Sequence, residues 1–234
     1  MKQASNNEDK VKEITDVLRR RIVLWKYPPN FPLVEENLAN EFSVSRSPIR
    51  MALTYLAAER LVERLPRRGF RVRQLQLDDV EELYEFRLAL EMQVIQGVAH
   101  KGIPQDILFD MQTTWQDLDT LAKKSLAEMA ELDEAFHTTF AKIYGNKLIL
   151  SHLESINERL IVFRELDFHH STRIDQTSQE HCEILHAIVS RNAALASDLL
   201  KRNIYSGLGN VENSIVRLVG NAYLHNSDFS GGNS

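Results

Sequence analysis

The chain has 234 residues, enough for one large domain or two smaller ones, and its 43% hydrophobic content is ordinary for a folded protein. No run of about 18 apolar residues occurs, so a membrane span is not expected. The polar N-terminus lacks the apolar core of a secretory signal. The single cysteine, Cys182, excludes an internal disulfide and fits a reducing compartment, so we expect a cytoplasmic protein.

Charge is distributed unevenly along the chain. Residues 1–75 contain 15 lysines and arginines against 9 acids, whereas residues 76–234 contain 13 against 24. The net charges of +6 and −11 together give the −5 of the whole chain. A basic part joined to a larger acidic part predicts two domains with different partners, of which only the first attracts phosphate backbones.

The basic part has a mixed pattern of elements. Residues 1–9 are polar and expected to be disordered, and apolar residues at helical spacing predict a helix from Lys10 to Trp25. Prolines interrupt the chain at 28, 29 and 32. Two short helices and two short strands with a turn between them follow, over 34–42, 45–59, 61–65 and 70–73. This order predicts a winged helix-turn-helix over residues 10–75.

The acidic part is helical almost throughout. Apolar spacing predicts about six helices, over 78–102, 104–124, 126–144, 146–164, 175–191 and 193–219. The tail 227–234 is rich in Gly, Ser and Asn and is expected to be disordered. The expected fold class is mainly α, with the N-terminal winged helix-turn-helix followed by an all-α antiparallel bundle over 78–222.

A cluster of basic and hydroxyl side chains lies at the start of the predicted helix 45–59. Arg46 and Arg50 are four residues apart and share one face. In a helix-turn-helix this helix start meets the major groove, where arginine can hold guanine or phosphate. Ser45 and Ser47 can donate to phosphates. The alternative is a solvated basic helix, but the order of elements and the division of charge favour binding to double-stranded DNA.

The same region resembles the GntR family of bacterial regulators. The resemblance covers residues 10–73 and is carried by five segments, PPNFPL at 28–33, ENLA at 36–39, VSRSPIR at 44–50, LV at 61–62 and RRGFRV at 67–72. It implies a DNA-binding transcription regulator. Position by position, the implied DNA contacts are Ser45, Arg46, Ser47, Arg50, Arg68 and Gly69.

Four positions depart from the family pattern. Asn30 and Arg60 stand where the family usually has glycine, and Arg60 is therefore expected to require a strained turn conformation. Met51 replaces the usual glutamate after the second arginine. Glu36 lies where some members have a phosphate-contacting arginine, so that contact is expected to be absent.

Three metal-capable side chains fall on apolar helix faces in the second part. Asp133 and His137 lie four residues apart within or beside the apolar stripe of helix 126–144. His181 projects into the centre of the next such stripe. A lone inward histidine is usually just hydrogen-bonded, but the three together favour a polar pocket in the bundle. An Asp and a His at this spacing can share one metal ion.

The second part resembles the FCD ligand-binding domain of the FadR subfamily. The segments RLALE at 87–91, LDEAFH at 132–137 and EH at 180–181 carry the resemblance. It implies a divalent metal, zinc or nickel, held by Asp133, His137 and His181. The position of the usual fourth ligand, a histidine, is Asn203, whose amide oxygen is a poorer ligand, so Asn203 or water would complete the shell.

The resemblance also implies a homodimer and small organic acids as effectors. Arg87 is the candidate for holding an effector carboxylate, because a guanidinium binds carboxylate bidentately. An ion pair between Arg87 and Glu91 is the alternative. The function expected is a repressor with operator affinity set by the acid, with or without metal. The rivals are a metal-free regulator with a purely structural dimerisation bundle, and a metal-dependent hydrolase, which the lack of an HExxH motif disfavours.

Overall fold

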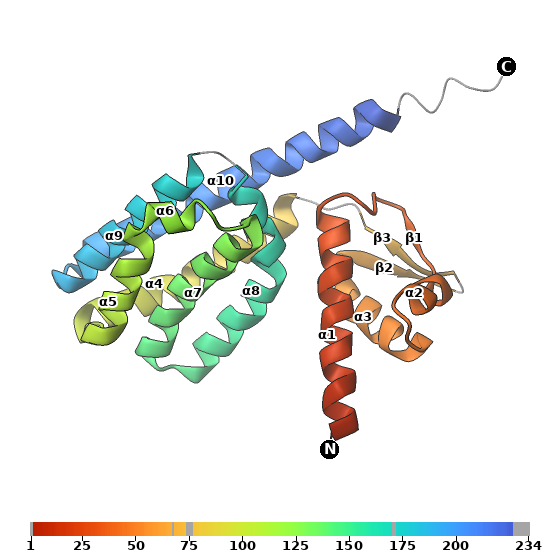
Figure 1. Cartoon of the computed structure of the whole chain (residues 1–234), viewed down its shortest axis with the longest axis horizontal. Helices are drawn as coiled ribbons and strands as arrows, with labels where there is room; N and C mark the ends of the chain where they lie inside the picture. The colour runs from red at the N-terminus through yellow and green to blue at the C-terminus, as the bar shows by residue number, and fades with distance from the viewer. Residues whose placement is uncertain (1, 67, 74–76, 170–171, 227–234) are drawn as a thin grey trace. The chain divides into compact units, whose positions relative to one another are not determined.

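The computed structural model describes residues 2–66, 68–73, 77–169 and 172–226, and Figure 1 shows its elements. The chain divides into two units, the first reaching Asp79 and taking in the end of the last helix from Leu218, the second spanning Val80–Arg217. Within the described residues, no helix is long and apolar enough to cross a membrane. The tail 227–234, expected to be disordered, lies outside the described residues.

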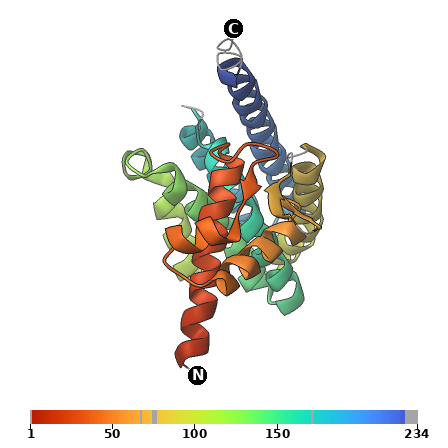
Figure 2. The ribbon, with the colours of Figure 1, turned by 90° about the vertical axis from the view of Figure 1, so that its right-hand side faces the viewer.

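The first unit combines three helices with a small antiparallel sheet (Figures 1 and 2). The helices are α1 (Lys2–Val23), α2 (Glu35–Glu41) and α3 (Arg46–Ala58), and the strands are β1 (Pro32–Leu33), β2 (Val62–Leu65) and β3 (Gly69–Val72), in the order β1-β3-β2. This is the predicted helix-turn-helix with its wing. Helix α1 begins at Lys2 and not at the predicted Lys10, so it includes residues 2–9 of the segment that was expected to be disordered.

Strand β1 was not predicted. Pro32 pairs with Arg71 and Leu33 with Phe70, so the proline-rich segment adds a third strand at the sheet edge. Proline is tolerated there because an edge strand leaves one side of its backbone unpaired. The core of the unit consists of apolar side chains from the helices and the sheet, including Ile14, Leu18, Ile49, Leu53, Leu56 and Phe70.

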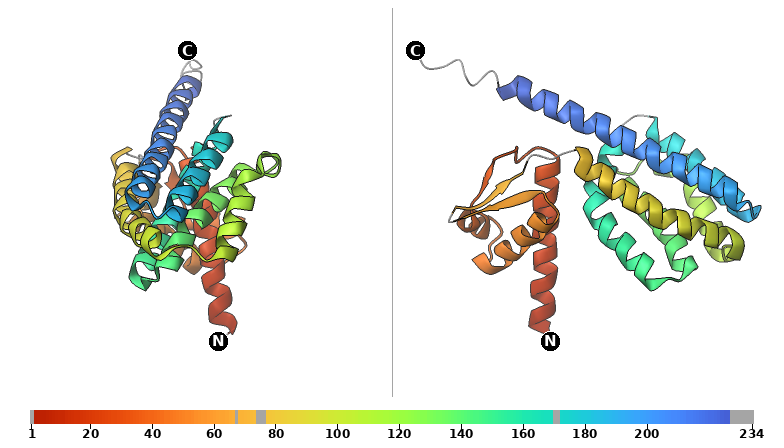
Figure 3. Two further views of the ribbon diagram at one scale, coloured as in Figure 1. Left: turned by 90° about the vertical axis from the view of Figure 1, so that its left-hand side faces the viewer. Right: turned by 180° about the vertical axis from the view of Figure 1, so that it is seen from behind.

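The second unit is helical throughout its described residues. Its helices are α4 (Leu77–Lys101), α5 (Gln105–Gln116), α6 (Leu118–Leu121), α7 (Leu126–Tyr144), α8 (Lys147–Asp167), α9 (Arg173–Val189) and α10 (Ala193–Asn226). Helix α7 packs along α8, and α9 packs against α5 and α6. Figure 3 shows α9 between α5 and α10. The mainly α fold class is therefore confirmed.

Local capping explains which helix bounds were predictable. Helix α7 has the predicted bounds because Ser125 and Glu128 form a capping box and Gly145 ends the helix with a φ of 87°. The helix predicted over 104–124 is instead broken into α5 and α6. Asp117 has a non-helical backbone there, and its side chain accepts a hydrogen bond from the backbone N–H of Thr120, which starts α6.

Candidate DNA interface and buried polar cluster

The predicted DNA-contacting residues of α3 share one exposed surface. Ser45, Arg46, Ser47 and Arg50 are all exposed, whereas Ile49 between them is fully buried in the core. Ser45 occupies the N-cap position, but its side chain makes no capping hydrogen bond. The N-terminal N–H groups of α3 are therefore not satisfied by that hydroxyl, and a helix start of this kind favours phosphate.

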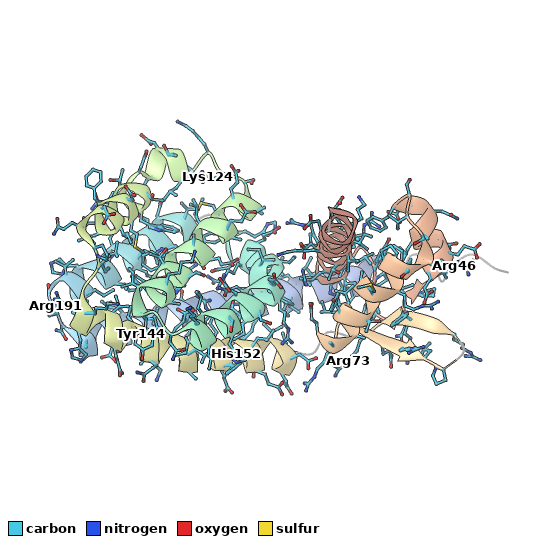
Figure 4. The ribbon with its side chains drawn as sticks, turned by 90° about the horizontal axis from the view of Figure 1, so that it is seen from below. Arg46, Arg73, Lys124, Tyr144, His152 and Arg191 are labelled. Atoms are coloured by element: carbon cyan, nitrogen blue, oxygen red, sulfur yellow. The ribbon has the colours of Figure 1, made fainter. Side chains whose placement is uncertain are left out.

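Two acids at the start of α2 hold the two arginines. The guanidinium of Arg50 donates to both carboxylate oxygens of Glu35, with Nε–Oε1 at 3.0 Å and Nη2–Oε2 at 2.7 Å. Arg46 Nη2 lies 2.9 Å from Glu36 Oε2. The hydrogen bond from Arg50 lowers the pKa of Glu35. Both arginine side chains remain about three-fifths exposed, at 59% and 63%, so DNA can still reach them. Figure 4 labels Arg46 beside α2 and α3.

The face of α3 that carries these arginines is a shallow groove of about 440 Å³. Its lining combines basic, hydroxyl and apolar side chains, namely Arg46, Ser47, Arg50, Met51, Thr54 and Tyr55. Met51 and Tyr55 are exposed although they are large and apolar. A surface that offers guanidinium donors next to apolar groups suits the major groove, where guanine presents acceptors and thymine a methyl group.

The wing supplies the remaining predicted contacts. Arg68 is exposed at the turn between β2 and β3, and its N–H donates to the carbonyl of Leu65 at 3.2 Å. Gly69 has a φ of 82°, a conformation that side chains disfavour, so the glycine is explained by the turn itself. The neighbouring Arg67 lies outside the described residues.

In the second unit, Asp133, His137 and His181 come together as predicted. The first two lie on α7 and the third on α9, all three are buried, and one possible ligand atom from each lies within 4.8 Å of the others. Asp133 Oδ1 is 3.4 Å from His181 Nε2 and 3.8 Å from His137 Nε2. One carboxylate oxygen thus faces both imidazoles, so the three side chains could share one metal ion.

The hydrogen bonds of the cluster leave the histidine nitrogens open toward Asp133. His137 Nδ1 lies 2.6 Å from Glu91 Oε2, on α4, which fixes the Nδ1–H tautomer and turns the lone pair of Nε2 inward. Among the described residues, neither His137 Nε2 nor either ring nitrogen of His181 has a hydrogen-bond partner. Such unsatisfied buried nitrogens fit a metal ion.

Electrostatics favour the metal-binding forms of two of the candidate ligands, His181 and Asp133. Burial lowers the pKa of His181 to about 4, more than its contact with Asp133 raises it, so its imidazole is neutral at neutral pH. Burial alone would raise the pKa of Asp133. The contact with His181 and the nearby His137 and Arg164 outweigh burial and hold that pKa well below its ordinary value. A neutral imidazole beside an ionised carboxylate is the protonation state that a divalent metal requires.

Arg87 forms the ion pair with Glu91 that we gave as the alternative to binding an effector carboxylate. Its Nε donates to Glu91 Oε1 at 2.6 Å, and its side chain is 3% exposed. Glu91 therefore bridges Arg87 and His137. Burial would raise the pKa of Glu91, but Arg87 and His137 lower it to about 2. Arg87 Nη2 has no hydrogen-bond partner among the described residues, so one donor remains for a ligand.

Sequence reasoning missed Arg164. This residue of α8 is 2% exposed, and its Nε lies 3.3 Å from Asp133 Oδ2 while Nη2 donates to Asn157 Oδ1 at 2.9 Å. A signal was available, because Arg164 follows Leu160 by four residues and therefore continues an apolar stripe into the core. Like Asp133, a charged residue at such a position indicates a buried polar site.

Asn203 is buried, as a member of the pocket would be. Its Nδ2 donates to Glu180 Oε2 at 2.7 Å, and Glu180 also accepts from Arg173 at 3.0 Å. The amide nitrogen of Asn203 is thus taken by an acid outside the Asp133 cluster. A ligand role for its amide oxygen stays a prediction.

Comparison with known families agrees with this division of the chain. Residues 10–72 match the gntR family of bacterial regulatory proteins, and residues 82–206 match the FCD domain. The chain is 27% identical to the Nta operon transcriptional regulator of Aminobacter aminovorans, over 88% of this chain and 96% of that protein. It is 26% identical to the transcriptional repressor RspR of Escherichia coli K12, over 88% and 89%.

A solved structure has the same fold at low sequence identity. The Escherichia coli protein McbR/YncC superposes with a TM-score of 0.62 at 14% identity, over 87% of this chain and 97% of that one. At this identity the likeness concerns the fold alone.

Proposed function

The chain belongs to the FCD-containing regulators of the GntR family, and we propose that it is a repressor whose affinity for its operator is controlled by a small organic acid. It is a transcription regulator and not an enzyme, since both families and the relatives are regulators. The hydrolase considered from the sequence is thereby set aside. Relatives named as repressors, such as RspR, support repression over activation.

The observation that carries the DNA-binding part of the proposal is the exposed face at the start of α3. It presents Arg46 and Arg50 from a rigid helix, with Ser45 and Ser47 beside them. We assign base contacts to the two arginines and phosphate contacts to the serines and to the wing at Arg68 and Gly69. The basic net charge of residues 1–75 would strengthen all of these contacts.

Replacing Arg50 tests this assignment. A duplex is first selected from a random library by the wild-type protein, and binding is then measured by fluorescence anisotropy. We expect Arg50→Ala to reduce affinity for the selected duplex to that for an unrelated duplex, because a lost bidentate contact costs about 1–3 kcal/mol of discrimination per half-site. Arg202→Ala, which removes an exposed arginine of α10, should change nothing. Retained specificity in Arg50→Ala would exclude α3 as the reading helix.

For the second unit we propose a divalent ion held by Asp133, His137 and His181. Nε2 of His137 and both ring nitrogens of His181, which have no hydrogen-bond partner among the described residues, support this set. When bound, such an ion offers open coordination positions to a carboxylate oxygen. The surrounding residues would orient the ligands and keep water away from them. Glu91 orients His137, and the rings of Phe136 and Trp115 pack on His181.

Metal analysis tests this part of the proposal. Protein purified without a chelator or a nickel column should contain about one divalent ion per chain. Glu91→Gln should weaken metal affinity by about 10–100-fold, because it removes the carboxylate that orients His137. Glu131→Gln, an exposed acid of α7, is the matched control. A metal-free wild-type protein, even after incubation with zinc, would support the metal-free alternative.

Control of DNA binding requires that the two units communicate. We propose a homodimer formed through the second unit, with each protomer presenting one α3 to a two-fold symmetric operator. Binding of the acid would repack the helices around the cluster and change the separation of the two DNA-binding units. The coupling free energy expected for such a switch is about 1–3 kcal/mol. A purely structural bundle would leave the buried polar cluster without a purpose, and an acid-induced thermal shift distinguishes the two.

A further inference from the structure

Two buried arginines converge on the Asp133 cluster with donors that no described residue satisfies. Arg87 approaches from α4 and Arg164 from α8, and their side chains are 3% and 2% exposed. Arg87 Nη2 and Arg164 Nε and Nη1 have no hydrogen-bond partner among the described residues. An unsatisfied donor on a buried charged group is costly, so such atoms mark a place for a ligand, an ion or water.

The acids around these arginines are already engaged. Of the two oxygens of Glu91, one accepts from Arg87 and the other faces His137. Of the two oxygens of Asp133, one faces both histidines and the other lies 3.3 Å from Arg164 Nε without hydrogen-bond geometry. Glu91 and Asp133 therefore have no oxygen left for the open guanidinium donors, and among the described residues only the partly exposed Glu134 lies near one of them.

The net charge of the cluster also favours an anionic ligand. Glu91 and Asp133 balance the two arginines, but a divalent ion at Asp133 would add two positive charges, and the nearby buried acid Asp167 is already paired with Arg173. Glu134 Oε2 lies 3.9 Å from Arg164 Nη1, yet its side chain is 30% exposed, so water screens that contact. Burial lowers the pKa of Arg164, and the positive charge of nearby Arg87 lowers it further.

We propose that the effector is a dicarboxylate, with one carboxylate on the metal at Asp133, His137 and His181 and the other on Arg87 and Arg164. This inference rests on the proposed acid-controlled function and narrows its ligand class. The second carboxylate would accept from the open guanidinium donors and would neutralise the added charge. A monocarboxylate can satisfy only one of the two binding groups.

Paired acids of equal carbon number test the inference on the full-length, zinc-loaded protein. Titration calorimetry compares malonate with propionate, succinate with butyrate, glutarate with valerate and adipate with hexanoate. At least one dicarboxylate should bind about tenfold or more tightly than the monocarboxylate of the same length. This ratio corresponds to about 1.4 kcal/mol of binding free energy, which the added charge-assisted hydrogen bonds would supply.

Variants assign the difference to Arg164. In Arg164→Gln the preferred dicarboxylate should bind no better than its monocarboxylate partner, while zinc content is retained. Arg164→Lys keeps the positive charge and serves as the test if Arg164→Gln does not fold. It should recover only part of the preference for the dicarboxylate. Arg202→Gln is the control and should behave as wild type.

The possible outcomes separate this inference from the function on which it rests. Equal binding of both acids in every pair, or a preference that survives in Arg164→Gln, overturns the dicarboxylate proposal and leaves an acid-responsive regulator standing. Failure of every acid to bind overturns both and leaves water as the occupant of the cluster.

Discussion

Arg60 has a φ of 62° at the turn that joins α3 to β2, and Asn30 has a φ of 68° before β1. Both stand where the family usually has glycine, so the backbone has kept its left-handed turns although the side chain has changed. Asparagine tolerates this conformation because of its short polar side chain, whereas a long side chain such as that of arginine disfavours it. The left-handed turn conformation expected for Arg60 from the sequence is therefore confirmed by its backbone angle.

Two substitutions at this position separate the strain from the side-chain contact. Arg60→Ala and Arg60→Gly both remove the ion pair with Asp79, at 3.1 Å, but only the glycine relaxes the turn. The free energy of unfolding in urea should be about 1 kcal/mol higher for Arg60→Gly than for Arg60→Ala. Equal stabilities would mean that the turn stores no strain.

At the scale of single residues, prediction from sequence worked where periodicity alone decides direction. Asp133, His137 and His181 were found because each interrupts an apolar stripe, and they do meet. The partners of Arg46 and Arg50 could not be found this way. Their contacts with Glu36 and Glu35 depend on how α2 and α3 are placed, which no periodicity within either helix specifies.

The pairing of α2 with α3 affects how the helix meets DNA. Glu36 holds Arg46 and places a negative charge beside the face of α3 that we assign to DNA. We expect Glu36→Gln to tighten binding to a selected duplex by about threefold or more at low salt, because the phosphates no longer meet a carboxylate. The gain should shrink as salt increases, since screening weakens the repulsion that was removed.

The control makes the same charge change at the other end of α2. Glu41 pairs with Arg21, and Glu41→Gln should alter affinity much less than Glu36→Gln. An equal gain in both variants would indicate a general effect of net charge and would contradict a specific role for Glu36.

Helix bounds were predictable where the sequence contains a cap and less so elsewhere. The capping box at Ser125 and the glycine at 145 specified α7, but Asp117 gave no comparable signal and the break between α5 and α6 was missed. Strand β1 was missed for a similar reason, because two residues with a proline resemble a loop until their pairing partner in β3 is known.

For the whole molecule, the division of charge along the sequence corresponds to two units with different chemistry. The first unit displays arginines to solvent at α3 and the wing, whereas the second buries Arg87 and Arg164 around acids and histidines. Exposed guanidinium groups suit a polyanion such as DNA, and buried ones suit a small anion. This contrast supports the proposal of a regulator that binds DNA with one unit and a small acid with the other.

Binding of the full-length protein to DNA tests this account most directly. After selection from a random library, the affinity for the enriched duplex is compared with that for an unrelated duplex at physiological salt. We predict a two-fold symmetric site bound about a thousandfold or more tightly than unrelated DNA. Failure to enrich any sequence, or equal affinity for the two duplexes, would contradict the claim that this chain is a sequence-specific regulator.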